Sequence, residues 1–100
     1  MSSFENRLRE EARLVILRLL AEQVDGSLSS SLMQTVLPSY AINRPRAWIH
    51  EEIGYLASLG AVRVSDQATV RIATITAKGR DHVERRLRIE GVKPPSDPED

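Results

Sequence analysis

Cysteine is absent from this sequence, which excludes disulfide bonds, a thiolate nucleophile and a sulfur-ligated zinc site. Aromatic residues are scarce, at 4%, and the fourteen basic and fourteen acidic residues cancel to a net charge of zero. A neutral chain has no overall electrostatic attraction to phosphate or to an anionic membrane surface. The lack of cysteine fits a cytoplasmic location, which we expect for this protein.

Long apolar runs are also missing. The longest, residues 14–17, is far shorter than the roughly 20 apolar residues of a membrane-spanning helix. The first residues carry several charges and do not follow the pattern of a signal peptide. We therefore expect a chain without a membrane partner.

Catalytic motifs are lacking as well, because the sequence has neither a Gly-x-Ser-x-Gly elbow nor a glycine-rich phosphate loop. Its two histidines, His50 and His82, have acidic neighbours but no further organised metal ligands. The sequence thus predicts no enzyme, no catalytic residue, no metal site and no cofactor.

Enough apolar residues are present, 41% of 100, for one domain with one modest core. Apolar residues recurring at steps of three and four predict a first helix over residues 4–24. The second half of this helix is apolar on two sides, and a small domain has few elements to bury both. We therefore expect a homodimer whose contact is formed by Leu14, Leu17 and Ala21.

A helix-turn-helix is predicted next. The second helix begins at a cap, Ser29 or Ser30, and ends at Pro38. A turn then covers residues 39–43, and a third helix covers about 45–59.

Beyond Gly60, alternating apolar residues predict a β-hairpin over 62–75, to which the short segment 27–29 can add an edge. Thr76 is expected to cap a last helix ending near Glu90. This order predicts a mainly α-helical winged helix-turn-helix domain with a small antiparallel β-wing.

The last ten residues, 91–100, contain three prolines and end in acidic residues. Such a segment neither continues a helix nor forms a core, so we expect an extended, largely unstructured tail. The domain is therefore predicted to cover residues 1–90.

Two segments frame the hairpin: Leu59-Gly60-Ala61-Val62 before it and Ile75-Thr76-Ala77-Lys78-Gly79-Arg80 after it. They resemble the L-x-x-x-G-L-V … L-T-x-x-G pattern of bacterial winged-helix regulators of the arsenic-repressor, multiple-antibiotic-resistance and phenolic-acid-repressor types. This resemblance implies the architecture and suggests DNA binding as the function.

A second resemblance covers residues 8–96. Its motifs are Ile16-Leu17-Arg18-Leu19-Leu20, the Gly60 and Thr76-x-x-Gly79 frame, and the ending Gly91-Val92-Lys93-Pro94-Pro95-Ser96. They resemble a family of small winged-helix proteins encoded by Mu-like prophages, which implies a regulator encoded in a phage neighbourhood near packaging functions. Typical members open the recognition helix with a Ser-Arg-Asp start, where this chain has Asn43-Arg44-Pro45-Arg46.

Charge is unevenly distributed along the chain. Residues 27–50 contain two arginines and no acid, residues 51–66 have two acids in excess, and residues 67–90 have three bases in excess. In a helix-turn-helix, the second helix reaches base edges in the major groove, and arginine suits guanine. We expect contacts with double-stranded DNA from the third helix and from one shared face of the hairpin. The residues are Arg44, Arg46, Ala47, His50, Arg63 and Arg71.

Two functions remain open. The first is a dimeric DNA-binding protein that regulates transcription in a phage or prophage. The alternative is a protein-interaction module of phage assembly or DNA packaging that keeps the fold without DNA affinity. Zero net charge favours the alternative, as do Glu51 and Glu52, which would repel phosphate from the third helix.

Overall fold

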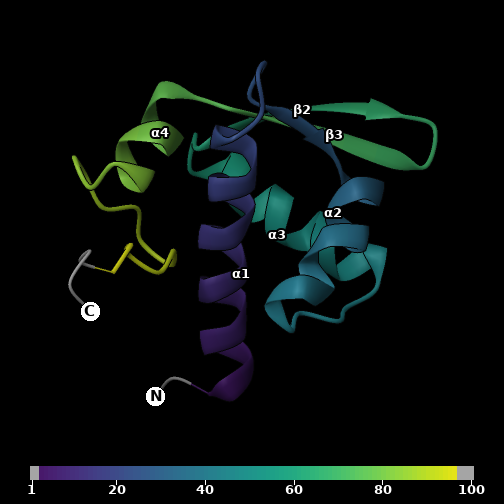
Figure 1. The fold of residues 1–100 in the computed structure, drawn as a ribbon, viewed down its shortest axis with the longest axis horizontal. Coiled ribbons are helices and arrows are strands. Elements are labelled where there is room, and N and C mark those ends of the chain that lie inside the picture. The colour runs from purple at the N-terminus through teal and green to yellow at the C-terminus, as the bar shows by residue number, and fades with distance from the viewer. Residues whose placement is uncertain (1–2, 97–100) are drawn as a thin grey trace.

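Figure 1 shows the computed structural model of the 100-residue chain, which describes residues 3–96. In chain order the elements are α1 (Phe4–Ala21), β1 (Ser27–Ser29), α2 (Ser30–Val36), the 3-10 turn η1 (Leu37–Tyr40), α3 (Arg46–Ser58), β2 (Val62–Gln67), β3 (Val70–Ile75) and α4 (Ala77–Val83). The strands form one antiparallel sheet in the order β1-β3-β2. This is the predicted fold class, a mainly α-helical winged helix-turn-helix whose wing is the β2–β3 hairpin.

Side-chain caps determine where three of the helices begin. The hydroxyl oxygens of Ser3, Ser29 and Thr76 each accept a hydrogen bond from the backbone N–H three residues further on, at 3.1, 3.2 and 3.2 Å. The caps predicted at Ser29 and Thr76 are therefore confirmed. The segment 27–29 also pairs with β3, as expected of an edge strand.

The pairing of β2 with β3 decides which side chains share a face of the wing. Directly opposed residues of an antiparallel pair lie on the same face, and the faces alternate along each strand. Arg63 lies opposite Thr74, whereas Arg71 lies opposite Asp66, on the face that buries Ala73. The prediction that Arg63 and Arg71 share one face is therefore wrong.

The two apolar sides of α1 are both covered within the single chain. Leu14 and Leu17 are 3% and 0% exposed, and Ala21 is partly buried against the same core. The C-terminal part of the chain lies against α1, where the Lys93 N–H donates to the Glu10 carbonyl at 3.1 Å, and its Ile89 and Val92 belong to the same core. Leu14 and Leu17 are thus buried without a second subunit, so the uncovered apolar side from which the dimer contact was predicted does not exist.

Helix α4 ends at Val83, well before the expected Glu90. Soon after its end the backbone adopts a left-handed conformation at Arg85, with φ of 67°, so the chain turns away from the helix axis. No helix among residues 3–96 is both long enough and apolar enough to span a membrane.

A buried histidine holds the segment that follows α4. His82, 0% exposed, accepts a hydrogen bond from the Ile89 N–H at Nδ1 and donates from Nε2 to the Lys93 carbonyl, both at 3.0 Å. Packing therefore continues into the segment 91–100 that was expected to be an unstructured tail. Residues 97–100 of that segment lie outside the described residues.

Candidate nucleic-acid interface

Helix α3 has one buried side and one side of small residues. Its apolar side chains, Ile49 and Ile53 among them, enter the core, whereas Ala47 and Ser58 are exposed. Gly54 lies between these two, and a Cβ added there would meet no atom within 4 Å. The outward surface of α3 is therefore smooth and open to a closely approaching partner.

Three of the predicted DNA-contacting side chains come together where α3 meets the wing: Arg46, His50 and Arg71, here called the α3–wing cluster. The Ser30 hydroxyl links two of its members, because it lies 2.8 Å from His50 Nε2 and accepts the Arg71 backbone N–H at 2.9 Å. Arg71 also donates from Nη1 to the His50 carbonyl at 3.5 Å. The cluster therefore combines one helix with the neighbouring strand of the wing.

Electrostatics within the cluster disfavour a proton on the imidazole. Burial lowers the pKa of His50 below its usual 6.5, and the guanidinium groups of Arg71 and Arg46 lower it further. Asp66 acts in the opposite direction. An approaching anion would relieve this repulsion and favour the charged imidazole.

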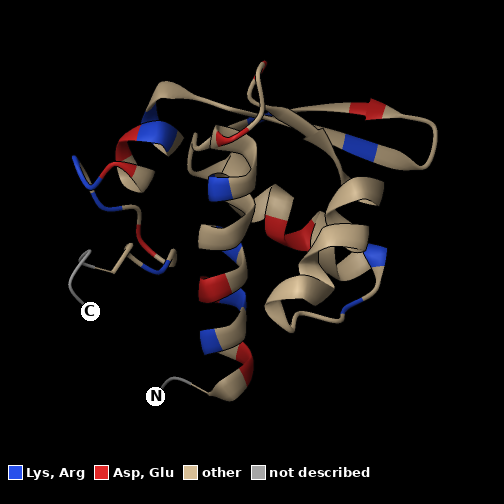
Figure 2. Ribbon diagram, viewed as in Figure 1, with Lys and Arg blue, Asp and Glu red and all other residues tan. Residues whose placement is uncertain are grey.

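Both arginines of the cluster also have partners within the fold. Arg71 Nε lies 3.0 Å from an Asp66 carboxylate oxygen, and Figure 2 shows acidic and basic residues on neighbouring strands of the hairpin. Arg46 donates from Nε to the Gln34 side-chain oxygen at 3.2 Å. These contacts orient the guanidinium groups, and Arg71, whose side chain is 31% exposed, retains access to solvent.

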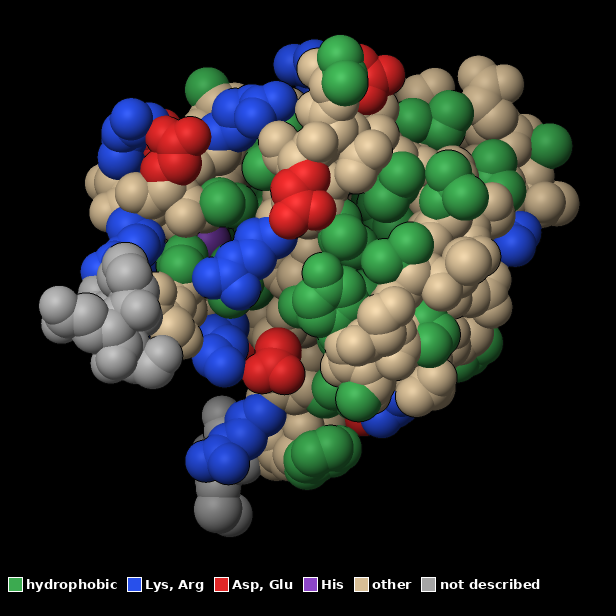
Figure 3. Space-filling model, in the orientation of Figure 1, with side chains coloured by type: hydrophobic (Ala, Val, Ile, Leu, Met, Phe, Trp, Pro, Cys, Tyr) green, Lys and Arg blue, Asp and Glu red, His purple; other side chains and the backbone are tan. Residues whose placement is uncertain are grey.

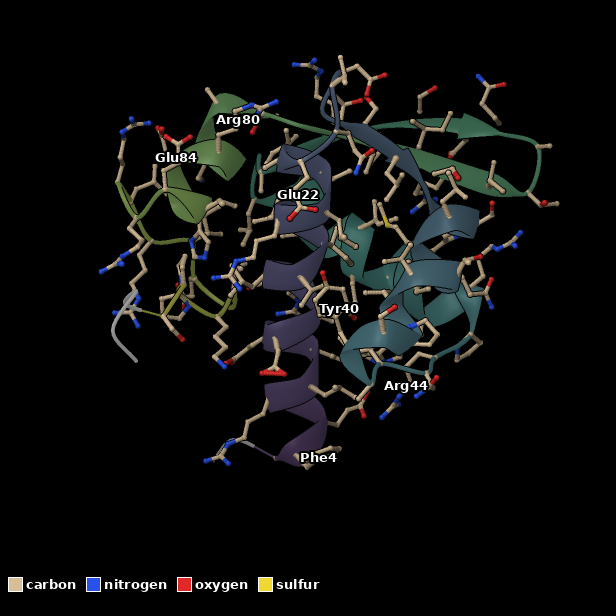
Figure 4. The ribbon with its side chains drawn as sticks, viewed as in Figure 1. Phe4, Glu22, Tyr40, Arg44, Arg80 and Glu84 are labelled. Atoms are coloured by element: carbon tan, nitrogen blue, oxygen red, sulfur yellow. The ribbon has the colours of Figure 1, made fainter. Side chains whose placement is uncertain are left out.

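Arg44 lies elsewhere. Figure 4 shows it at the end of the domain away from the wing, and it pairs with Glu5 of α1 at 3.0 Å. Its guanidinium group also stands 5.3 Å from the centre of the Trp48 ring, while Trp48 Nε1 donates to Glu5 at 2.8 Å. The Trp48 hydrogen bond is the largest cause of a lowered Glu5 pKa, and the charges of Arg44 and Arg9 add to it. Arg44 therefore helps to join α3 to α1.

The remaining two predicted contacts divide between helix and wing. Ala47 is exposed on α3 beside the cluster, in a position to meet the same partner. Arg63 is exposed on the opposite face of the hairpin from Arg71, next to Thr74. Arg63 and the α3–wing cluster therefore do not form one continuous surface.

An ion-pair network joins α1 to α3 and was not predicted from the sequence. Glu52 is 1% exposed, lies 2.7 Å from Arg13 Nε and also pairs with Arg9, which reaches Glu51 at 3.1 Å. The expectation that both glutamates repel phosphate is corrected for Glu52, which faces α1, whereas Glu51 stays 64% exposed beside Arg9. The sequence carried a signal for the burial of Glu52, because this residue shares the helical phase of the buried side of α3.

The elements and the cluster define a class of protein, a winged helix-turn-helix domain with cationic side chains where α3 meets the wing. Over 88 residues the chain is 35% identical to an uncharacterized protein, gp26, of Escherichia phage Mu, a match that spans 88% of this chain and 91% of gp26. The chain therefore belongs to the family of this phage Mu protein, which confirms the expected relation to Mu-like phages. No family model and no solved structure matches it.

Proposed function

We propose that this phage protein binds double-stranded DNA through α3 and the wing, and that it regulates transcription. The observation that carries the proposal is the α3–wing cluster, in which Arg46, His50 and Arg71 converge beside the exposed side of α3. An α-helix fits the major groove, and arginines at its start and on a wing reach base edges and phosphates.

The glycine on the exposed side of α3 supports the proposal. A glycine in a helix interior costs about 1 kcal/mol relative to alanine, and nothing in the described part of the chain occupies the space beside Gly54. A partner whose backbone comes close to the helix would explain the glycine, because any side chain at this position would obstruct the approach. A DNA strand passing the outward surface of α3 is such a partner.

A second candidate function is a protein-interaction module of phage assembly or DNA packaging. It is favoured by the zero net charge and by Glu51, whose side chain is 64% exposed at the edge of the same helix surface. In this alternative the smooth side of α3 receives another phage protein, and the α3–wing cluster binds acidic side chains of that protein.

Fluorescence anisotropy with a labelled duplex of mixed sequence, measured over a range of salt concentrations, separates the two functions. If DNA is the partner, Arg71→Ala weakens binding to all sequences and reduces the slope against salt by about one, since one phosphate contact is lost. Arg63→Ala is the matched control on the opposite face of the wing and leaves the slope unchanged. If the parent protein fails to bind duplex DNA at low salt, the DNA proposal is wrong and the interaction module replaces it.

A further inference from the structure

The side of α1 that faces solvent carries alternating charges. Arg7, Glu11, Arg18 and Glu22 are exposed, and their spacing of four, seven and four residues places them on one side of the helix. Figure 2 shows acidic and basic residues alternating along this helix, and Figure 4 labels Glu22 near its upper end. We call these four residues the outer stripe.

Most of the outer stripe forms no salt bridge within the described part of the chain. Among residues 3–96, neither Arg7, Arg18 nor Glu22 forms a salt bridge, and Glu11 pairs with Lys93 alone, at 3.1 Å. Three charged groups aligned on one helix are thus available to a partner that carries the opposite charges in matching order.

An apolar surface accompanies the outer stripe. A hollow of about 430 Å³ lies at its middle, with Leu14 and Val15 at the floor and Tyr40 at one side. Tyr40 is 48% exposed, and Figure 3 shows hydrophobic side chains gathered beside the charged residues of α1 on this face. The face therefore offers the Tyr40 ring as apolar contact beside two pairs of charges, while Leu14 and Val15, 3% and 7% exposed, form the floor of the hollow.

We propose that a second copy of this chain docks on the outer stripe, with the two α1 helices antiparallel about a two-fold axis between residues 14 and 15. This centre is equally far along the chain from Glu11 and Arg18, and equally far from Arg7 and Glu22. Rotation about it sets Glu11 against Arg18 of the second copy and Arg7 against Glu22, each pair occurring twice. A parallel arrangement would set like charges against each other, so the charges specify the antiparallel one.

The dimer leaves α3 free. Arg9 and Arg13, which bind Glu52 of α3, lie on the opposite side of α1 from the outer stripe. The two copies of α3 therefore face away from each other across the dimer. If the proposed DNA binding holds, one dimer carries two separate duplexes, whereas the dimer itself does not depend on that function.

A charge exchange tests the pairing by analytical ultracentrifugation. The parent protein is a dimer at micromolar concentrations, and Arg18→Glu raises the dissociation constant by about 100-fold or more, because two attractive contacts become repulsive. Glu11→Arg does the same, and the double variant E11R/R18E restores the dimer because the reversed charges again match. Arg88→Glu, exposed and off the stripe, is the control and leaves the dimer intact.

Each contrary outcome overturns the proposal. A parent protein that stays monomeric at these concentrations excludes the dimer. An Arg18→Glu variant that associates as tightly as the parent excludes this surface. A double variant that stays monomeric while folded, by circular dichroism, excludes this pairing of charges.

Cross-linking tests the register independently, since the chain has no cysteine of its own. A mixture of Glu11→Cys and Arg18→Cys chains should form a disulfide-linked heterodimer on oxidation, because these positions meet across the axis. Glu11→Cys alone should not, because its two copies lie about 10 Å apart along the helices, beyond the reach of a disulfide. Equal cross-linking of Glu11→Cys with itself, or none in the mixture, contradicts the register.

Discussion

The two long edges of α3 carry similar charged residues that have different roles. On the edge toward α1, Arg9 and Arg13 enclose Glu52, so the charges neutralise each other and join two helices. On the edge toward the wing, Arg46 and Arg71 act on His50 together with one acid, Asp66, which is 64% exposed. On these two edges of α3, an arginine is therefore a structural residue where a carboxylate is buried with it and a candidate binding residue where none is.

The largest expected effect is on the α1 edge. Glu52→Gln keeps the shape of the side chain but removes the buried counter-charge of Arg13, which is 13% exposed, and one of the three carboxylates around Arg9, which is 25% exposed. Unfolding in urea should show a loss of about 3 kcal/mol in the free energy of unfolding. Glu51→Gln is the control, since its side chain is 64% exposed, and should change stability by less than about 0.5 kcal/mol. Similar losses in the two variants would mean that the network does not hold α1 against α3.

Substitutions on the wing edge of α3 should affect DNA binding rather than the stability of the fold. Arg46→Ala is expected to weaken binding to a preferred DNA site by about 1–3 kcal/mol and binding to random DNA only slightly, because base contacts carry the specificity. Titrations of selected and random duplexes measure the difference. Arg44→Ala should leave both affinities nearly unchanged, because this guanidinium group is held by Glu5 and Trp48. Equal losses for the two arginines would show that the α3–wing cluster is not the preferred contact.

The sequence predicted what is local. The caps at Ser29 and Thr76 and the order of helices and strands depend on residues a few positions apart. The pairing of Arg9 with Glu52, 43 residues away, and the anchoring of residues 89–93 by His82 depend on contacts that periodicity does not encode.

The prediction of which hairpin side chains share a face failed for a related reason. Strand β3 has apolar residues in both phases, with Val70 and Ile72 in one and Ala73 and Ile75 in the other. Either phase could face the core from sequence alone, and choosing the wrong one moves every side chain to the other face. In the structure Arg71 therefore lies on the face that contacts α3, whereas Arg63 lies on the opposite face.

A smaller effect is expected on the surface between the two edges. Gly54→Ala should stabilise the fold by about 0.5–1 kcal/mol, because alanine favours the helix and its methyl group enters open space. Thermal unfolding measures this gain. If a partner closely approaches α3, the same methyl group should weaken DNA binding despite the more stable fold. A stabilised variant that binds DNA as well as the parent would exclude close contact at this position.

The smallest expected effect is the pH dependence contributed by His50. Its folded-state pKa lies below the unfolded value of 6.5, because burial and then Arg71 and Arg46 disfavour the charged ring. The unfolded chain therefore binds more protons than the folded chain, and stability present above pH 6.5 is lost as the pH falls from that value through the folded pKa. His50→Gln, which can keep the hydrogen bond to Ser30, should remove this part of the dependence in urea titrations from about pH 5.5 to about pH 8. DNA affinity should change the other way, since a nearby phosphate favours the protonated ring, so the parent should gain more affinity than the variant as the pH falls. An equal gain in the two proteins would place the phosphate away from His50 and leave the wing edge of α3 without a DNA contact at its centre.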